Sequence, residues 1–138
     1  NELSTSELHN LLQLRSEVFV VEQNCVYQDI DGKDEKAIHV LGYYNHELVA
    51  FSRLFDKGYY FDETSIGRVV VSPKYRDKKF GHDLMRVSIE AIKNNFNETT
   101  IEISAQEYLQ KFYESHGFIK ISEMYLEDDI PHIRMKKG

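Results

Sequence analysis

A turn crowded with cations separates two segments of different pattern. Residues 69–71 are a β-branched run, and residues 81–95 have the apolar spacing of a helix. The turn between them contains Lys74, Arg76, Lys78 and Lys79. The first residues of a helix carry unpaired N–H groups and a partial positive charge, which favour anions and above all phosphate. The pattern therefore favours an anion site, although a solvated lysine-rich turn has the same composition.

This turn differs from the common nucleotide-binding loops. No G-K-S or G-K-T triplet follows it, as in a Walker A loop, and no G-x-G-x-x-G fingerprint is present. The polar loop QDIDGKDE, residues 28–35, contains D-x-D-G. Ile38, however, stands six residues after Gly32, where a calcium loop needs a bidentate glutamate. No Cys/His cluster has zinc spacing. We expect no metal.

Length and composition bound the class of protein. The 138 residues suffice for one domain with its own core, and no linker divides them. A net charge of −6 argues against general nucleic-acid binding, and no apolar run is long enough to span a membrane. The single cysteine, Cys25, cannot form an internal disulfide, which favours a reducing, cytoplasmic location.

The apolar periodicity predicts the elements that position these residues. A capping box at Ser4–Glu7 predicts a helix from Ser6 into residues 18–21. Strands are expected at 38–44, 47–55, 65–72 and 99–104, helices at 81–95 and 106–116, and a closing hairpin at 118–126 and 132–136. This order predicts a mixed α/β or α+β layer fold. Strands 65–72 and 99–104 should be parallel, joined by a right-handed crossover, and the run 69–71 should be buried on both faces.

Three motifs carry a family resemblance. The segment from Gly67 to Met85 resembles motif A of the GNAT acyl-CoA N-acyltransferases, Q/R-x-x-G-x-G/A, with Arg76 and Gly81 at its first and last positions. Lys79 replaces the first glycine of that motif. FYESHGF, residues 112–118, resembles motif B. LRSEVFVVEQNC, YQDIDG and the late DIPHI are similar to the ElaA branch of the family.

The resemblance implies the GNAT fold over residues 1–138, with a mixed, mostly antiparallel sheet flanked by helices and a splayed central parallel pair. Such domains start with a strand before the first helix, so we expect that strand to be absent from this chain. The resemblance also implies that the anion is the pyrophosphate of acetyl-CoA. Strand backbone would bind the pantetheine amides, and N–H groups of residues 77–82 the pyrophosphate. The expected cofactor-binding residues are Val69, Val70, Val71, Arg76, Asp77, Lys78, Lys79, Phe80, Gly81, His82 and Gln106.

The same resemblance implies direct acetyl transfer to a primary amine of a small molecule or peptide. An alkylamine of pKa about 10.4 must lose a proton before attack, and a thiolate leaving group, whose thiol has a pKa of about 8.5, benefits from a proton donor. Tyr113 matches the family position whose phenol faces the thioester sulfur. Its helical spacing with Phe112 and His116 also fits a core residue, and Tyr108 is the alternative phenol.

The sequence leaves the base and the acceptor open. Glu22, at the end of the first helix, is the first candidate for a catalytic base, and His132 is the second. A water chain would serve equally. Glu22, His39 and His132 are the expected acceptor-binding residues. The loop carboxylates at 29, 31, 128 and 129 would suit a polyamine, an aminoglycoside or a lysine side chain, but such charges are commonly only solvated.

Rival functions stay open beside the transferase. One is a non-catalytic acyl-CoA-binding or sensor module, with which Lys79 in the motif is compatible. Another is acyl-homoserine-lactone synthesis, since those synthases share the R-x-x-V-F of Arg15–Phe19 but are longer and lack this motif A. Cys25 is a remote candidate for an acyl carrier and fits an inert thiol better. GNAT domains often pair, so a homodimer is a further expectation. We expect neither nucleic acid nor membrane as a partner.

Overall fold

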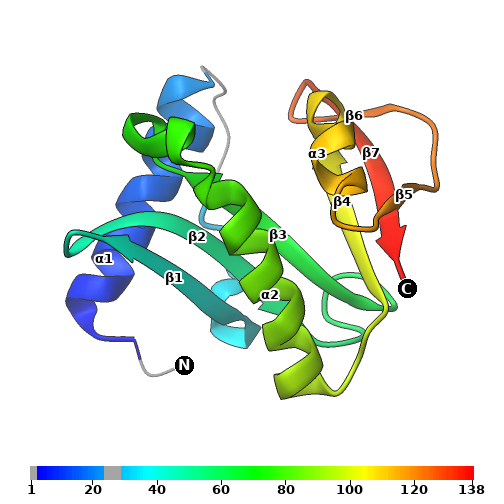
Figure 1. Ribbon diagram of the computed structural model, residues 1–138, viewed down its shortest axis with the longest axis horizontal. Helices are drawn as coiled ribbons and strands as arrows, with labels where there is room; N and C mark the ends of the chain where they lie inside the picture. Colours follow the sequence, from blue (N-terminus) through cyan, green and yellow to red (C-terminus); the bar gives the residue numbers. More distant parts are fainter. Residues whose placement is uncertain (1–2, 24–28) are drawn as a thin grey trace.

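One mixed sheet organises the protein. The computed structural model describes residues 3–23 and 29–138. The sheet has the order β1-β2-β3-β4-β7-β5, and β6 pairs with β7 (Figure 1). Its strands are β1 (Ile38–Tyr44), β2 (Glu47–Phe55), β3 (Thr64–Val71), β4 (Ile101–Gln106), β5 (Ile119–Lys120), β6 (Tyr125–Glu127) and β7 (Ile130–Lys137). Only β3 and β4 form a parallel pair. This arrangement agrees with the expected mixed, mostly antiparallel sheet with a central parallel pair.

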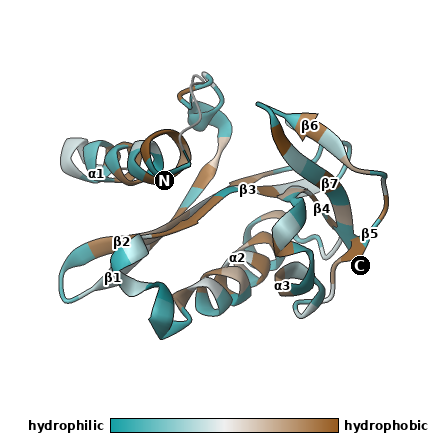
Figure 2. Cartoon of the chain, turned by 90° about the horizontal axis from the view of Figure 1, so that it is seen from above, coloured by the Kyte–Doolittle hydropathy of each residue, from teal (hydrophilic) through white to brown (hydrophobic). Residues whose placement is uncertain are grey.

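Helices cover both faces of the sheet. Figure 2 shows α1 (Thr5–Arg15) on one side, and α2 (Phe80–Phe96) and α3 (Gln110–Glu114) on the other. On the α1 side, Leu11, Leu14 and Val18 pack against Phe51 and Val70. The larger core, on the α2 side, includes Leu54, Met85, Ile92, Ile101, Ile133 and Met135. Because successive strand residues point to opposite faces, β2 and β3 contribute to both cores.

The first helix begins and ends as its sequence suggests, but its last turns widen. The Ser4 hydroxyl accepts a hydrogen bond from the Glu7 N–H at 3.1 Å, and the Glu7 carboxylate accepts one from the Ser4 N–H at 2.9 Å. This is the predicted capping box. After Arg15 the chain continues as the π-helix η1 (Ser16–Glu22). π-helical turns are rare and occur frequently at functional sites.

Two expectations about the second half of the chain need correction. Gln106 is the last residue of β4, where it pairs with His132, so the expected helix from 106 starts later. It comprises the 3₁₀ turn η4 (Glu107–Leu109) and the short α3. The expected strand 118–126 is two short strands, β5 and β6, because they pair with separate stretches of β7. The turn before β7 has left-handed residues at Asp128 and Asp129, and Pro131 lies within the strand.

The parallel pair holds together only at its first residues. Thr64 pairs with Ile101 and Ser65 with Glu102, and no further pairs join β3 to β4. Beyond that point β3 pairs with β2 alone and β4 with β7 alone, so the two strands splay apart (Figure 1). A bulge marks the divergence: the β2–β3 register shifts between Phe51 and Arg53, opposite Arg68, whose φ is 49°. The splay leaves the facing strand edges without ladder partners.

No helix within the described ranges 3–23 and 29–138 is long and apolar enough to cross a membrane.

Candidate active site

A cavity of about 670 Å³ lies between the splayed strands. Its lining comes from the π-helix η1, from β3 and β4, from the start of α2, from α3 and from the turn between β6 and β7. Of the residues predicted for the site, it brings together Glu22, Val69, Val70, Val71, Arg76, Lys79, Gly81, His82, Gln106, Tyr113 and His132. Val70 is buried, whereas Val69 and Val71 are only partly buried, which corrects the expectation of a strand buried on both faces.

Lys79 explains why the motif commonly has a glycine at its position. The basic turn is the 3₁₀ segment η3 (Pro73–Lys78), and Lys79 follows it with φ 61° and ψ 27° before α2 begins. Glycine reaches this left-handed conformation without strain, whereas other residues pay about 1–2 kcal/mol. Lys79 adopts it nevertheless and lines the cavity, to which it brings a positive charge.

The side chains of three predicted cofactor residues do not line the cavity: Asp77, Lys78 and Phe80. The Lys78 ammonium lies 5.4 Å from the centroid of the Tyr44 ring. The Phe80 ring packs against the same tyrosine, with 5.3 Å between the ring centroids. These contacts direct the side chains of Lys78 and Phe80 towards Tyr44.

Glu22 and Arg76 bind each other. Arg76 donates to Oε2 of Glu22 from Nη1 at 2.6 Å and to Oε1 from Nη2 at 2.7 Å, and its Nε donates to the Val71 carbonyl at 3.2 Å. Such a bidentate pair fixes both side chains. It occupies both oxygens of the candidate base and most of the guanidinium expected to meet a phosphate.

Tyr113 is a buried phenol at the wall of the cavity. Its side chain lies on α3, with 6 % of the residue exposed, and its ring meets those of Phe112 and Phe118 edge to face. Burial raises the pKa of the phenol well above its usual value of 10.0, and the nearby Tyr108 adds to the rise. A group with this pKa stays protonated and suits the role of a donor, not that of a base. Tyr108 also lines the cavity but is 75 % exposed.

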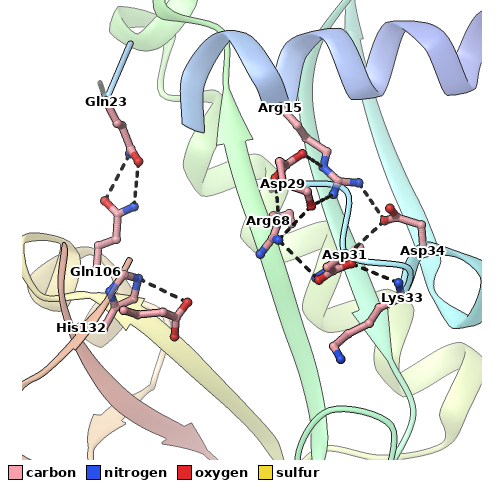
Figure 3. Close-up of polar contacts among 11 residues, drawn as sticks. Arg15, Gln23, Asp29, Asp31, Lys33, Asp34, Arg68, Gln106 and His132 are labelled. Carbon is pink, nitrogen blue, oxygen red and sulfur yellow. Dashed lines mark hydrogen bonds and ion pairs between the residues drawn. The ribbon is translucent and has the colours of Figure 1, made fainter. Parts of the chain in front are cut away.

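His132 has one ring nitrogen committed and one facing a carboxylate. Its Nδ1 lies 2.7 Å from the Ile130 carbonyl, which can only accept, so Nδ1 carries the proton in the neutral ring. Nε2 lies 3.9 Å from Oε2 of Glu127. The ring is buried, with 7 % exposed, and the residue lines the cavity (Figure 3). A fixed tautomer with a basic nitrogen at the cavity wall is the arrangement that proton abstraction requires.

Gln106 meets Gln23 across the cavity. Each side-chain amide donates to the other's oxygen at 3.4 Å (Figure 3). Gln106 ends β4, whereas Gln23 follows η1, so this contact joins elements on opposite sides of the splay.

His39 is not brought to the cavity. It lies on β1, where Nε2 donates to the Asp34 carbonyl at 3.1 Å and the ring stacks on Phe51. Burial lowers the pKa of this histidine, which leaves it neutral. We therefore leave His39 out of the proposed acceptor site.

An arginine–aspartate network holds the loop that precedes β1, and sequence patterns did not reveal it. Figure 3 shows Arg15 and Arg68 meeting Asp29, Asp31 and Asp34. Arg15 binds Asp29 at 2.9 Å and Asp34 at 2.7 Å, and Arg53 binds Asp31 at 2.6 Å. Arg15 and Arg53 are fully buried. Asp29 and Asp31, considered above as attractors of a cationic acceptor, instead bind arginines. In the sequence, the signal that could have revealed this network was a single arginine inside each of two otherwise apolar segments.

Two further expectations from the sequence concern a metal ion and Cys25. Among residues 3–23 and 29–138 no group of three or more His, Cys, Asp or Glu side chains is placed to hold a metal ion. Cys25 lies outside the described residues.

Comparison with known proteins places this geometry in a family. Residues 4–138 match the family described as "Acetyltransferase (GNAT) domain". The chain is 47 % identical to the protein ElaA of Escherichia coli, over 99 % of this chain and 91 % of ElaA. Among solved structures, it resembles an acyl-CoA N-acyltransferase from Pseudomonas aeruginosa with TM-score 0.92, 42 % identity and coverage of 99 % of this chain and 94 % of the other.

Two further structures extend the comparison. Escherichia coli ElaA superposes with TM-score 0.91 and 46 % identity, over 99 % of this chain and 93 % of that one. An aminoglycoside 6′-N-acetyltransferase complexed with coenzyme A shares the fold alone, at 17 % identity and TM-score 0.74, over 99 % of this chain and 93 % of that one. The chain therefore belongs to the GNAT acetyltransferase family and is an N-acyltransferase.

Proposed function

We propose that this protein transfers the acetyl group of acetyl-CoA directly to a primary amine of a small molecule or peptide. The observation that carries the proposal is the cavity between the splayed strands, which has a cationic helix start at one part of its wall and a buried, protonated Tyr113 at another. A protein of the same fold is complexed with coenzyme A, which supports this choice of substrate. The lone cysteine supports a cytoplasmic site of action.

The geometry suggests how acetyl-CoA would be held. The unpaired edge of β3, at residues 67–71, offers backbone groups to the pantetheine amides. The first turn of α2 offers N–H groups and a positive dipole end to the pyrophosphate, and Lys79 adds a charge beside them. Gly81 lies in that turn and lines the cavity, so a ligand can approach the backbone there.

The transfer step assigns one role to each of two side chains. The amine nitrogen attacks the thioester carbonyl carbon, the C–N bond forms, and the C–S bond breaks. Nε2 of His132 takes the amine proton, and the phenol of Tyr113 donates a proton to the departing sulfur. His132 is preferred to Glu22 as the base because both oxygens of Glu22 already accept from Arg76. His132 then releases its proton to solvent and Tyr113 regains one from solvent, so a neutral amine and acetyl-CoA yield the amide and the CoA thiol with no other co-reactant.

Binding and turnover measured on Gly81 variants test this function. A Cβ at Gly81 would lie 3.5 Å from the Phe112 ring, which is ordinary contact, so Gly81→Ala should fold normally. We expect micromolar acetyl-CoA binding by isothermal titration, weaker binding of ATP, and binding of desulfo-CoA similar to that of acetyl-CoA. Gly81→Glu should reduce the affinity at least tenfold because its carboxylate would stand in the pyrophosphate site, and Gly81→Ala is the matched steric control.

The outcomes separate enzyme from module. Acetyl-CoA binding with amine-dependent thiol release supports the transferase. Binding without thiol release across an amine screen would instead support the non-catalytic acyl-CoA-binding module. Equal affinity of wild type and Gly81→Glu would contradict the proposed pyrophosphate site.

A further inference from the structure

Glu127 stands where two hollows meet. A second, open hollow of about 440 Å³ is lined by Tyr60, Phe61, Ser104, Tyr125, Glu127 and Arg134. Ser104 and Glu127 also line the main cavity, which holds Tyr113 and His132. An acceptor whose amine reaches His132 can therefore extend past Glu127 into the second hollow.

The Glu127 carboxylate lacks a lysine or arginine partner among the described residues. Nε2 of His132 lies 3.9 Å from it, a contact that is ionic only when the imidazole is protonated. Two nearby carboxylates differ in this respect, because Glu22 binds Arg76 and Glu102 binds Arg134. Arg134, the cation of the second hollow, is thus already neutralised. The side chain of Glu127 is partly exposed, and its negative charge faces both hollows.

A chain of hydroxyl groups fixes this carboxylate. A carboxylate only accepts, so the Ser104 hydroxyl donates to Oε1 of Glu127 at 2.9 Å. The Tyr125 hydroxyl, 2.5 Å from Ser104 Oγ, must then donate to that oxygen. The two hydroxyl groups, one bonded to the other, therefore hold the Glu127 carboxylate in place.

The aromatic rings beside Glu127 suit a cation as well. Arg134 already lies 5.3 Å from the centroid of Phe61, and Lys33 lies 5.9 Å from that of Tyr60. Ring faces attract cations at such distances. Burial raises the pKa of the Tyr60 phenol and the charge of Glu127 adds to the rise, which reflects how near the carboxylate is.

We propose that Glu127 binds a second ammonium group of the acceptor, so that the preferred substrate is an aliphatic diamine or polyamine. The proposal rests on the function proposed above. With hydrogen bonds of ordinary length at His132 and at Glu127, whose atoms are 3.9 Å apart, the two nitrogens of the acceptor are separated by at most about 10 Å. Short and medium-length diamines meet this limit in extended form.

Four amines with the same carbon chain test the inference. Diaminobutane, butylamine, aminobutanol and aminobutyrate differ only in the group that would meet Glu127, and thiol release from acetyl-CoA measures transfer to each. We expect kcat/KM for diaminobutane to exceed that for butylamine about tenfold to a hundredfold, the range of a charge-assisted hydrogen bond. Aminobutanol should resemble butylamine, and aminobutyrate should be the poorest acceptor.

The variant Glu127→Gln locates the effect. It should raise KM for diaminobutane to that for butylamine and abolish the preference for the diamine. Glu123→Gln removes the same charge at an exposed position outside both hollows and should change neither. An equal fall of kcat with both amines would show that Glu127 acts through His132, and would overturn the proposal. Equal use of all four amines by the wild type would also overturn it. Absence of transfer to any primary amine would contradict the transferase function itself.

Discussion

The bidentate contact between Glu22 and Arg76 links two residues that the motifs assign to separate tasks. Each neutralises the other at the wall of the cavity. Both side chains are exposed, so the pair contributes only about 0–1 kcal/mol and a phosphate can displace the carboxylate at little cost. The contact therefore opposes anion binding without preventing it.

At this residue scale we predict that Glu22→Gln strengthens acetyl-CoA binding. Releasing Arg76 should lower Kd up to about fivefold, which corresponds to an exposed ion pair, and kcat should stay close to that of the wild type. Isothermal titration and steady-state kinetics measure the two quantities. Glu17→Gln, an exposed position on the same π-helix, is the matched control.

The same two measurements, made on a variant of His132, test the assignment of the base. His132→Gln should lower kcat about a hundredfold or more and leave acetyl-CoA affinity unchanged, as expected for loss of a general base. A comparable loss of kcat in Glu22→Gln, with His132→Gln active, would transfer that role to Glu22.

A second prediction at the residue scale concerns the phenol of Tyr113. Tyr113→Phe keeps the buried ring and removes only the hydroxyl, so acetyl-CoA binding should persist while kcat falls about a hundredfold. Because burial raises the pKa of this phenol, it stays protonated through the alkaline range, and its ionisation should add no falling limb to the kcat profile below pH 10. Unchanged kcat in Tyr113→Phe would refute the donor role and turn attention to Tyr108.

At the scale of elements, the arginine network ties the loop before β1 to three separate elements. Arg15 comes from α1, Arg53 from β2 and Arg68 from the bulge of β3. Their partners Asp29, Asp31 and Asp34 lie close together on the loop and the short turn η2 (Asp34–Lys36). Removing one partner of a buried ion pair leaves the other charge uncompensated, which is strongly destabilising.

The network predicts an acid-sensitive contribution to stability. Burial alone would raise the pKa of Asp31, but hydrogen bonds from Arg53 and the Lys33 backbone, with the charges of Arg53 and Arg68, lower it well below its ordinary value of 3.8. Burial would also raise the pKa of Asp34, but the hydrogen bonds and charges of Arg15 and Arg53 together lower it. A group whose pKa is lower in the folded state stabilises the fold above its unfolded pKa. That stability is lost as the pH falls below about 4.

Asp31→Asn measures this contribution. At pH 7 the variant should lose about 2 kcal/mol of unfolding free energy, the scale of a hydrogen bond to a charged group. Denaturant unfolding between pH 7 and pH 3 measures the unfolding free energy of both proteins. The difference between the variant and the wild type should shrink as the pH falls into the acid range. Asp129→Asn, in the exposed turn before β7, should have no such effect. A constant difference at all pH values would exclude the linkage.

At the scale of the whole molecule, the site exists because the sheet is divided. β3 and β4 share two residue pairs and then separate, and the cavity between them collects side chains from both halves. The contact of Gln23 with Gln106 spans the same space. The walls of the cavity differ in charge: Lys79 lies at the start of α2, and Glu127 lies before β7. A substrate that is anionic at one end and an acceptor that is cationic would therefore enter from different sides.

Local patterns determined most of the elements. Alternation and β-branched runs predicted β1, β2 and β3, and the Asn45-His46 turn between the first two has the left-handed φ values of 50° and 67° that a tight hairpin needs. Apolar spacing predicted both ends of α2 and the start of α1 to within a residue, whereas the expected last turns of the first helix are the π-helix η1. The motifs identified the family, and with it the basic turn. Only short elements were predicted wrongly. One is the helix expected from Gln106, where pairing with His132 overrides the local preference.

Tertiary structure alone decided which side chains meet. Glu22 and Arg76 are far apart in the chain, as are Arg53 and Asp31, and no periodicity encodes such pairs. The bulge at Arg68 and the early end of the β3–β4 ladder are likewise features of strand pairing that no local pattern predicted. Glu127 shows the same limit. The sequence presents it as one more acid near a turn, and only the fold places it between two hollows, without an arginine and beside His132. Periodicity records which face of an element is buried, whereas contacts between distant residues arise only when the elements pack.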